Sequence, residues 1–421
     1  MKSSIILSAS LIILAVAASV RAEPYSITPW IKTKQSYSDN ILFSEKNEAS
    51  DFITTFTGGL TLEQNLERLK TNLSGHLNQF FYWDYNDLDS LDYNVSGSLK
   101  YRMTERAGLN ASARYTKDSQ KDRDTETTGL VVSGDRKKAD LSLGADYMLS
   151  ELNRIEISMY ISDSDRNEAD ESEDSNTTEV GLTFRRDMSA YFKNTVGLCN
   201  LKYLHYTGEE DTYTESGLNE YTFLQNYTSD VYQFSTGFSH DISELYSLFF
   251  QVGASYTQTD EKQDIYWLSF NNISFLSPVL FSQSEYDTDT WGGIFSTGID
   301  YKDEYWTMGL TLFQDVRGGT GTSGAIQRTS LSGTLSRKLS DALTLTFNAS
   351  AYLNKSERES NSDTDTLTFN LQPGFRYKLK RNFILSFAWR FTSVEDREDD
   401  TTTTRNLVYF DLKKEFDLKD F

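Results

Sequence analysis

The sequence predicts an all-β protein, specifically a transmembrane antiparallel up-and-down β-barrel. Three observations support this fold class. Apolar and polar residues alternate along many short segments, as in strands with one apolar face. The connections between these segments alternate between short and long, as in outer-membrane barrels. The chain begins with a segment typical of exported proteins. Its 421 residues include four prolines, and 14% of them are aromatic. We predict about 18 strands, with 16 as the alternative.

The first segment has the layout of a secretory signal peptide. Residues 1–22 read MKSSIILSASLIILAVAASVRA, in which Lys2 precedes an apolar stretch and small residues stand before the expected cut after Ala22. Cleavage there leaves a single transmembrane barrel domain, residues 23–421. We therefore expect export to the outer membrane of a Gram-negative bacterium. The lone cysteine, Cys199, excludes an internal disulfide.

The alternation is clearest in residues 139–162, ADLSLGADYMLSELNRIEISMYIS. Leu141 and Leu143 share one face before the polar turn at Ser150, and Ile155 and Ile157 share the same face after it. An unpaired backbone group costs several kcal/mol in hydrocarbon, so such a sheet must close on itself. The apolar face then contacts lipid. The same alternation is found in residues 73–83, 91–103, 343–353, 367–379 and 383–391, and it is poor in residues 192–206.

Short and long connections succeed one another along the chain, which places every second connection on the same side of the membrane. We expect eight short periplasmic turns, at residues 67–70, 104–107, 150–153, 189–191, 243–245, 303–304, 340–341 and 380–381. Nine longer outer loops are predicted between them, including residues 163–176, 206–226 and 397–404. These outer loops are acidic and account for the net charge of −21. A negative rim concentrates cations at a channel mouth; solvation, or divalent bridging to lipid, is the alternative role.

Two segments near the N-terminus carry a family resemblance. SYSDNILFS, residues 36–44, ends the first predicted strand, and SDFITTFTGGLTL, residues 50–62, begins the second. This exit and re-entry resembles the β-barrel porins of Gram-negative bacteria, in particular the outer-membrane barrels associated with exopolysaccharide and PEP-CTERM protein-sorting systems. The resemblance implies a porin-like barrel. It also implies polysaccharide secretion components as partners.

Charged residues on the polar face are candidates for lining the channel. Rings of lumen charge set ion preference, although some charges pair across strands and only support the wall. We also expect residues 260–287, an unusually apolar loop, to constrict the pore. The lumen-lining candidates are Lys100, Arg102, Arg114, Glu156, Arg185, Asp300, Arg376 and Arg390.

Nothing in the sequence favours catalysis. His76, His205 and His240 lie far apart, without a second ligand at metal-binding spacing. Residues 317–324, RGGTGTSG, lack the lysine and the helix of a phosphate-binding loop. We therefore predict no enzyme activity, no metal, no cofactor and no nucleic-acid partner.

The sequence thus predicts an outer-membrane porin-like channel for small solutes or ions. The alternatives are an exopolysaccharide export conduit and a non-conducting structural or adhesive surface barrel. A soluble all-β protein is a further alternative, but it offers no reason for loops to be segregated by length. The expected partners are outer-membrane lipid, lipopolysaccharide and the barrel-assembly machinery. The oligomeric state is left open by the sequence.

Overall fold

The computed structural model describes residues 25–416, apart from residues 121–124, 126–128, 132–133, 169–170, 217–218, 271–272, 319–324, 357–364 and 380–381. The predicted signal peptide and the 380–381 turn lie outside the described residues. The described chain forms one 18-stranded antiparallel sheet. Its only helical turn, η1, spans Asn86–Leu88, so no described helix is long and apolar enough to cross a membrane.

The strands follow one another along the chain. Their bounds are β1 Ser26–Ser38, β2 Asp51–Asn65, β3 Leu69–Tyr82, β4 Ser90–Arg102, β5 Ala107–Asp118, β6 Asp135–Met148, β7 Asn153–Glu168, β8 Glu171–Asp187, β9 Thr195–Ser216, β10 Asn219–Asp241, β11 Tyr246–Phe270, β12 Ile273–Lys302, β13 Trp306–Gly318, β14 Ala325–Lys338, β15 Leu343–Ser356, β16 Asp365–Lys378, β17 Phe383–Asp396 and β18 Thr401–Glu415.

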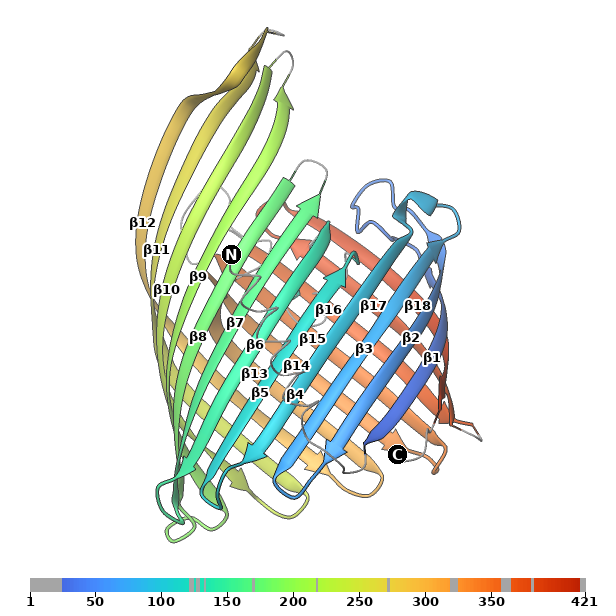
Figure 1. The fold of residues 1–421 in the computed structure, drawn as a ribbon, viewed down its shortest axis with the longest axis vertical. Coiled ribbons are helices and arrows are strands. Elements are labelled where there is room, and N and C mark those ends of the chain that lie inside the picture. The colour runs from blue at the N-terminus through green and yellow to red at the C-terminus, as the bar shows by residue number, and fades with distance from the viewer. Residues whose placement is uncertain are drawn as a thin grey trace.

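The sheet closes into a barrel (Figure 1). Each strand pairs with its sequence neighbours, and β1 also pairs with β18, from Trp30 opposite Glu415 to Ser38 opposite Leu407. The predicted fold class is confirmed, and the strand number is 18 rather than 16. Closure leaves neither the first nor the last strand with a free edge, which satisfies the backbone in hydrocarbon.

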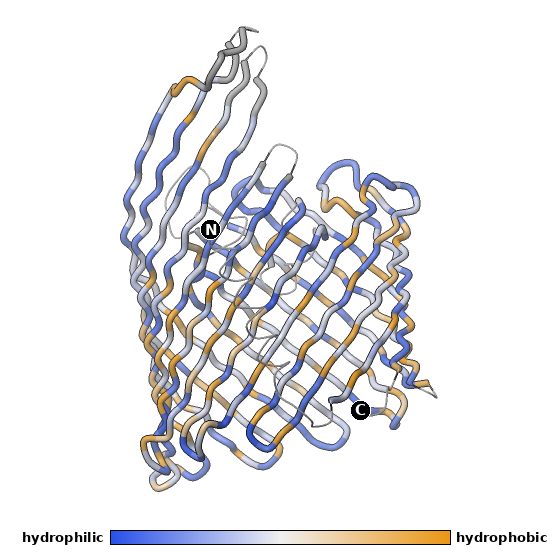
Figure 2. Tube along the Cα trace, viewed as in Figure 1, coloured by the Kyte–Doolittle hydropathy of each residue, from blue (hydrophilic) through white to orange (hydrophobic). Residues whose placement is uncertain are grey.

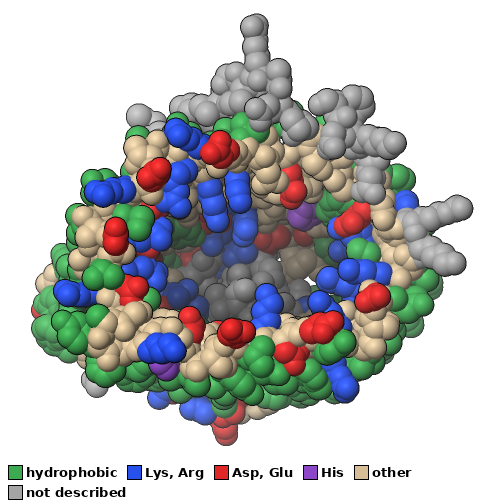
Figure 3. Space-filling view, turned by 90° about the horizontal axis from the view of Figure 1, so that it is seen from below, with side chains coloured by type: hydrophobic (Ala, Val, Ile, Leu, Met, Phe, Trp, Pro, Cys, Tyr) green, Lys and Arg blue, Asp and Glu red, His purple; other side chains and the backbone are tan. Residues whose placement is uncertain are grey.

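The two faces of the wall differ in character, as predicted. Leu143 and Ile157 are 42% and 53% exposed on the outer face, whereas polar residues of the other parity face the lumen. Figure 2 shows the alternation along the strands, and Figure 3 shows apolar side chains around the outside with charged ones bordering the central hollow.

Aromatic pairs mark the two ends of the lipid-facing band on β11 and β12. The rings of Tyr256 and Trp291 are 5.0 Å apart at one end, and those of Tyr246 and Tyr301 are 4.6 Å apart at the other. Ten residues of tilted strand separate Trp291 from Tyr301, which corresponds to a band of about 25 Å.

Several of the short turns are closed by the same kind of hydrogen bond, from a backbone N–H group to a side-chain oxygen at the start of the turn. The hydroxyl oxygen of Ser150 accepts a hydrogen bond from the backbone N–H of Asn153 (3.1 Å). The hydroxyl oxygens of Ser243 and Ser340 likewise accept from the backbone N–H groups three residues later in the chain. Asp303 replaces the hydroxyl with a carboxylate, which accepts from the backbone N–H groups of Tyr305 and Trp306. A Ser, Thr or Asp at the first turn position therefore fixes the hairpin.

Several connections that were predicted as outer loops are strands. The described residues of 163–176, 206–226 and 260–287 continue the ladders of β7 to β12, and Figure 1 shows β9 to β12 rising above the other strands. The predicted constriction by residues 260–287 is therefore wrong. Above the membrane both faces of a strand meet water, so the apolar alternation disappears while the backbone pairing continues.

Substitution of Asp303 directly tests the contribution of the side-chain hydrogen bonds that close the short turns. The hydrogen bond from Tyr301, followed by that from the Trp306 N–H, lowers the pKa of the Asp303 carboxyl below its ordinary 3.8. We expect Asp303→Ala to lower the melting temperature of the detergent-solubilised barrel at neutral pH. Because the native pKa is depressed, this deficit is full above pH 3.8 and shrinks as the pH falls below it. A deficit of the same size at every pH would contradict this explanation. Glu304→Ala, in the same turn, is the control.

Candidate functional site in the barrel lumen

The connection between β5 and β6 crosses the lumen. The backbone oxygen of Thr125 accepts a hydrogen bond from Nδ2 of Asn370 on β16 (2.7 Å), and that of Gly129 accepts one from the hydroxyl of Thr368. Thr368 and Thr125 are fully buried by this contact. Strands β5 and β6 lie on the opposite side of the barrel from β14 to β16 (Figure 1), so the described part of this connection (residues 119–120, 125, 129–131 and 134) reaches from one wall to the other. This segment, rather than residues 260–287, narrows the channel.

The far end of this crossing segment is held by apolar contacts. Leu130 packs against Ile326 of β14, and both side chains are buried. Gly129 has a φ of +76° and lies against the Tyr352 side chain, where an added Cβ atom would come within 2.5 Å of the Tyr352 Cβ. Only glycine fits this backbone conformation and this space.

The upper end of β13 and β14 also turns into the lumen. Val316 and Ala325 pack on Leu204 and Val231, which lie on the inner faces of β9 and β10. In addition, Nε2 of Gln233 on β10 donates to the backbone oxygen of Val316 (2.9 Å). Inward-facing apolar residues on β9 explain why the alternation was poor in residues 192–206.

The inner wall of β9 and β10 joins this cluster to a buried charge. The Tyr206 and Tyr227 hydroxyls lie 3.3 Å apart, and the Tyr227 hydroxyl donates to the carboxylate of Glu173 on β8 (3.2 Å). Arg166 pairs with the same carboxylate at 3.0 Å. Every one of these side chains is buried, so a hydrogen-bonded network supports the wall behind the β13–β14 end.

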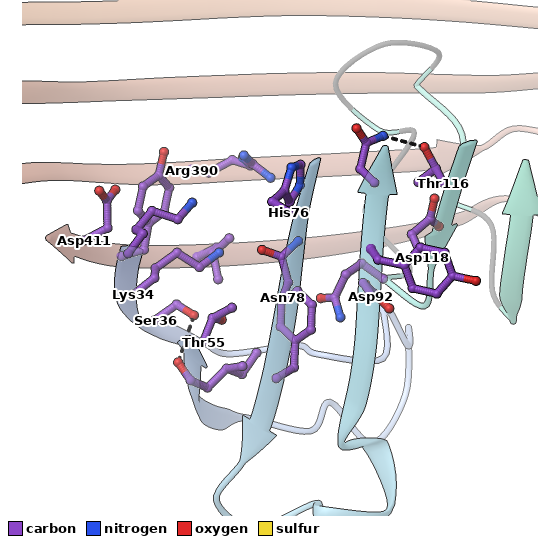
Figure 4. Close-up of a pocket in the computed structure, with 18 of the residues that line it drawn as sticks. Lys34, Ser36, Thr55, His76, Asn78, Asp92, Thr116, Asp118, Arg390 and Asp411 are labelled. Carbon is purple, nitrogen blue, oxygen red and sulfur yellow. Dashed lines mark hydrogen bonds between the residues drawn. The ribbon is translucent and has the colours of Figure 1, made fainter. Parts of the chain in front are cut away.

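An open cavity of about 490 Å³ remains on the wall formed by β17, β18 and β1 to β5. Figure 4 shows Lys34, Arg390 and His76 reaching into this space from three strands. Gln120, from the crossing segment, lines the same cavity. The space left beside the crossing segment is therefore bordered by four cations and three carboxylates, which are Lys32, Lys34, Arg390 and Arg405, and Asp92, Asp118 and Asp411.

This side of the lumen carries an excess of positive charge. Asp411 and Glu415 are the acidic residues between the cations on β18, and Glu415 pairs with Lys413 at 2.7 Å. We call the inward-facing cations of β1, β16, β17 and β18 the basic wall. They are Lys32 and Lys34 on β1, Arg376 on β16, Arg390 on β17, and Arg405 and Lys413 on β18.

The structure brings three of the predicted lumen residues together near the short-turn end. Arg185 pairs with Glu156 at 3.0 Å, and Arg154 joins Glu156 (3.2 Å) to Asp146 (3.2 Å). Arg102 lies 3.7 Å from the same Asp146 carboxylate. Within this network three arginines share two carboxylates across neighbouring strands, so these residues brace the wall.

The other predicted residues are dispersed. Arg376 and Arg390 belong to the basic wall. Lys100 and Arg114 lie apart from it, on β4 and β5, and Asp300 lies on β12 beside Gly309. Reasoning from alternation identified which side chains share a face. It missed Lys32, Lys34 and Arg405, although the same alternation in β1 and β18 would have located them.

The histidines do not assemble a site. His205 contacts Asp230 on the outer face (2.8 Å), His240 contacts Thr195 (2.9 Å), and His76 lies 5.9 Å from the ring of Trp30. Among the residues that the structure describes, no group of three or more His, Cys, Asp or Glu side chains could hold a metal ion.

Comparison with known proteins supports a transport barrel. Residues 17–133 match the family model described as "Putative beta-barrel porin 2", and this match includes both segments that carry the porin resemblance. The resemblance to β-barrel porins is thereby confirmed over this part of the chain. No curated protein matches the sequence. The closed barrel, its apolar belt and this match define an outer-membrane-type β-barrel.

Solved structures with a similar shape include two transporters and an uptake receptor. The ferric citrate transporter FecA matches with a TM-score of 0.48 and 10% identity, covering 90% of this chain and 61% of its own. The ferric yersiniabactin receptor FyuA from Yersinia pestis has a TM-score of 0.46 and 7% identity, covering 94% and 81%. The copper transporter OprC has a TM-score of 0.47 and 10% identity, covering 88% and 64%. The present chain thus spans less than two thirds of FecA and of OprC.

The anchoring of the crossing segment can be tested by removing its hydrogen bonds. We expect Thr368→Ala combined with Asn370→Ala to loosen residues 119–134, because two buried backbone oxygens lose their donors at about 1–3 kcal/mol each. Vesicle-swelling assays should then show faster entry of a trisaccharide relative to a monosaccharide. Asn348→Ala, at an exposed asparagine of the same parity on β15, is the matched control. An unchanged ratio of the two rates would contradict the role of this segment.

Proposed function

We propose that the protein is a narrowed porin-like channel that passes small hydrophilic solutes across the outer membrane and favours anions. The observation that carries this proposal is the open cavity between the crossing segment and the basic wall. A polar, water-lined path beside a narrowing is what a diffusion channel requires. Four cations and three carboxylates line the cavity, so its lining keeps a small positive excess, and Lys32, Lys34 and Arg390 are grouped on its β17, β18 and β1 side.

The acidic exterior does not determine this preference. Most of the acidic excess lies in the outer connections and in the strand ends above the membrane, where water and salt screen it within about 8 Å. The basic wall lies inside the barrel, where the low dielectric of the surrounding protein and lipid focuses its field on a passing solute. We therefore expect the charges of the basic wall to influence ion preference more than the charges of the acidic rim do.

Planar-bilayer recordings of the purified mature chain test the channel directly. We expect discrete conductance steps and a reversal potential in a KCl gradient that indicates anion preference. Lys34→Gln combined with Arg390→Gln should reduce the anion-to-cation permeability ratio by about threefold, which corresponds to roughly 0.7 kcal/mol of lost Coulomb attraction.

The matched control removes two positive charges elsewhere. Lys137→Gln combined with Arg186→Gln alters residues of the outward parity and should leave the ratio unchanged. If the wild-type protein inserts but gives no conductance steps, the channel proposal is wrong and a non-conducting surface barrel takes its place.

A further inference from the structure

In the described wall, the neighbouring strands β12 and β13 are paired over only part of their length. We call the place where their pairing stops the seam. Strand β12 pairs with β11 from Phe270–Ile273 at the tip down to Tyr301, but it pairs with β13 only from Phe295 to Lys302. Above Phe295, the described residues of β12 have no strand partner on the β13 side. By contrast, β13 and β14 remain paired up to Gly318.

The seam ends inside the lipid-facing band. Phe295 lies four residues below Trp291, which belongs to the outer aromatic pair, and six residues above Tyr301, which belongs to the inner pair. The unpaired stretch between Phe295 and Trp291 therefore lies at the level of the outer leaflet. Gly293 is in this stretch, and a Cβ atom built on it meets nothing within 4 Å.

The cause of the seam is the inward turn of β13. Continued pairing would place Val316 opposite Gly293, but Val316 is fully buried against the inner faces of β9 and β10 instead. The side chain of Gln314 closes the gap at this point. Its Nε2 donates to the Gly293 backbone oxygen (2.7 Å), and its Oε1 accepts from the Thr329 hydroxyl (3.0 Å). A side chain, rather than a strand, seals the wall here.

A cavity lies on the lumen side of this seal. Its volume is about 250 Å³, and it is lined by Phe295 and Phe313 together with polar residues such as Ser296. On the lipid side, the open space at Gly293 faces the apolar exterior of the barrel next to Trp291. A separate apolar groove of about 670 Å³ lies over β7 to β11 and reaches β12 only at Trp291.

Arg317 connects the seam to the interior of the barrel. It lines the seam cavity and also the adjoining lumen cavity of about 360 Å³. Its Nε pairs with Asp315 at 2.5 Å, and the described residues form no other hydrogen bond to its guanidinium. The two terminal nitrogens are therefore available for an anionic oxygen.

We propose that the β12–β13 seam is a lateral slot that binds an amphiphile from the outer leaflet. The apolar chain enters from the lipid at Gly293 and passes Gln314, and the anionic headgroup reaches Arg317 at the lumen side. An amphiphile is the solute whose two ends match a path that is apolar at the lipid and cationic at the lumen. The slot is additional to the hydrophilic path along the basic wall, which lies on other strands.

A fluorescent label at the slot tests this proposal. In the full mature chain, Cys199→Ala removes the native thiol, Ser296→Cys accepts a bimane label, and the protein is reconstituted in phosphatidylcholine vesicles. We expect dodecyl phosphate to change the bimane emission saturably, and butyl phosphate, which lacks the long chain, to have no effect at the same concentration. Ser332→Cys, a lumen-facing serine on β14, should not respond when labelled in the same way.

Three further variants separate the slot from unspecific partitioning. Gly293→Trp fills the open space at the mouth and should abolish the response, whereas Gly58→Trp, at an equally open outward glycine on β2, should not. Arg317→Gln should weaken apparent binding about tenfold, the loss typical of a charge-assisted hydrogen bond. Equal responses at positions 296 and 332, or an unchanged response in Gly293→Trp, would overturn the proposal. KCl conductance recorded without amphiphile tests the channel separately, so either proposal can fail alone.

Discussion

The need to pair every backbone N–H and C=O group in hydrocarbon determines most of this structure. No water is available inside the bilayer to replace a missing partner, so the sheet must close, and β1 therefore lies between β18 and β2. Closure in turn assigns one side-chain parity to lipid and the other to the lumen. Outside the bilayer the requirement is relaxed, because water can satisfy a free edge. That is where β9 to β12 extend. β12 loses its second partner slightly lower, at the level of the outer leaflet, where the Gln314 side chain bonds to the Gly293 backbone oxygen.

This constraint explains which features could be predicted from the sequence. Leu141 and Ile155 alternate with polar residues because lipid is on one side of them and water on the other, and Ser150 marks the turn between them. Strand number, connection order and closure all follow from that pattern. Beyond the membrane, both faces of a strand are wet and hydropathy no longer alternates. Residues 206–226 therefore resembled a loop, although their threonines and tyrosines suit a strand.

The narrowing of the lumen could not be predicted from the alternation of apolar and polar residues, for a different physical reason. Thr368 and Asn370 are polar and face inward, as a water-filled lumen requires, and nothing in their spacing distinguishes a solvated side chain from one that holds a distant segment. The contact joins residues more than 200 positions apart on opposite walls. Periodicity reports the environment of a face, whereas a contact across the lumen depends on the shape of both partners.

At the inward turn of β13, the free energy of lost backbone hydrogen bonds competes with the free energy of burying an apolar side chain. Pairing β13 fully with β12 would regain a few backbone hydrogen bonds at the outer leaflet, each worth about 0.5–1.5 kcal/mol net where water or headgroups can compete. It would also withdraw Val316 from the cluster around Tyr206 and Val231, and burial of one such side chain is worth about 1.5–3 kcal/mol. Because Gln314 already replaces one of the lost bonds at Gly293, the packed arrangement is favoured. The same displacement that fills the lumen therefore leaves the wall open at the outer leaflet, so narrowing of the central path and access from the side have a single structural cause.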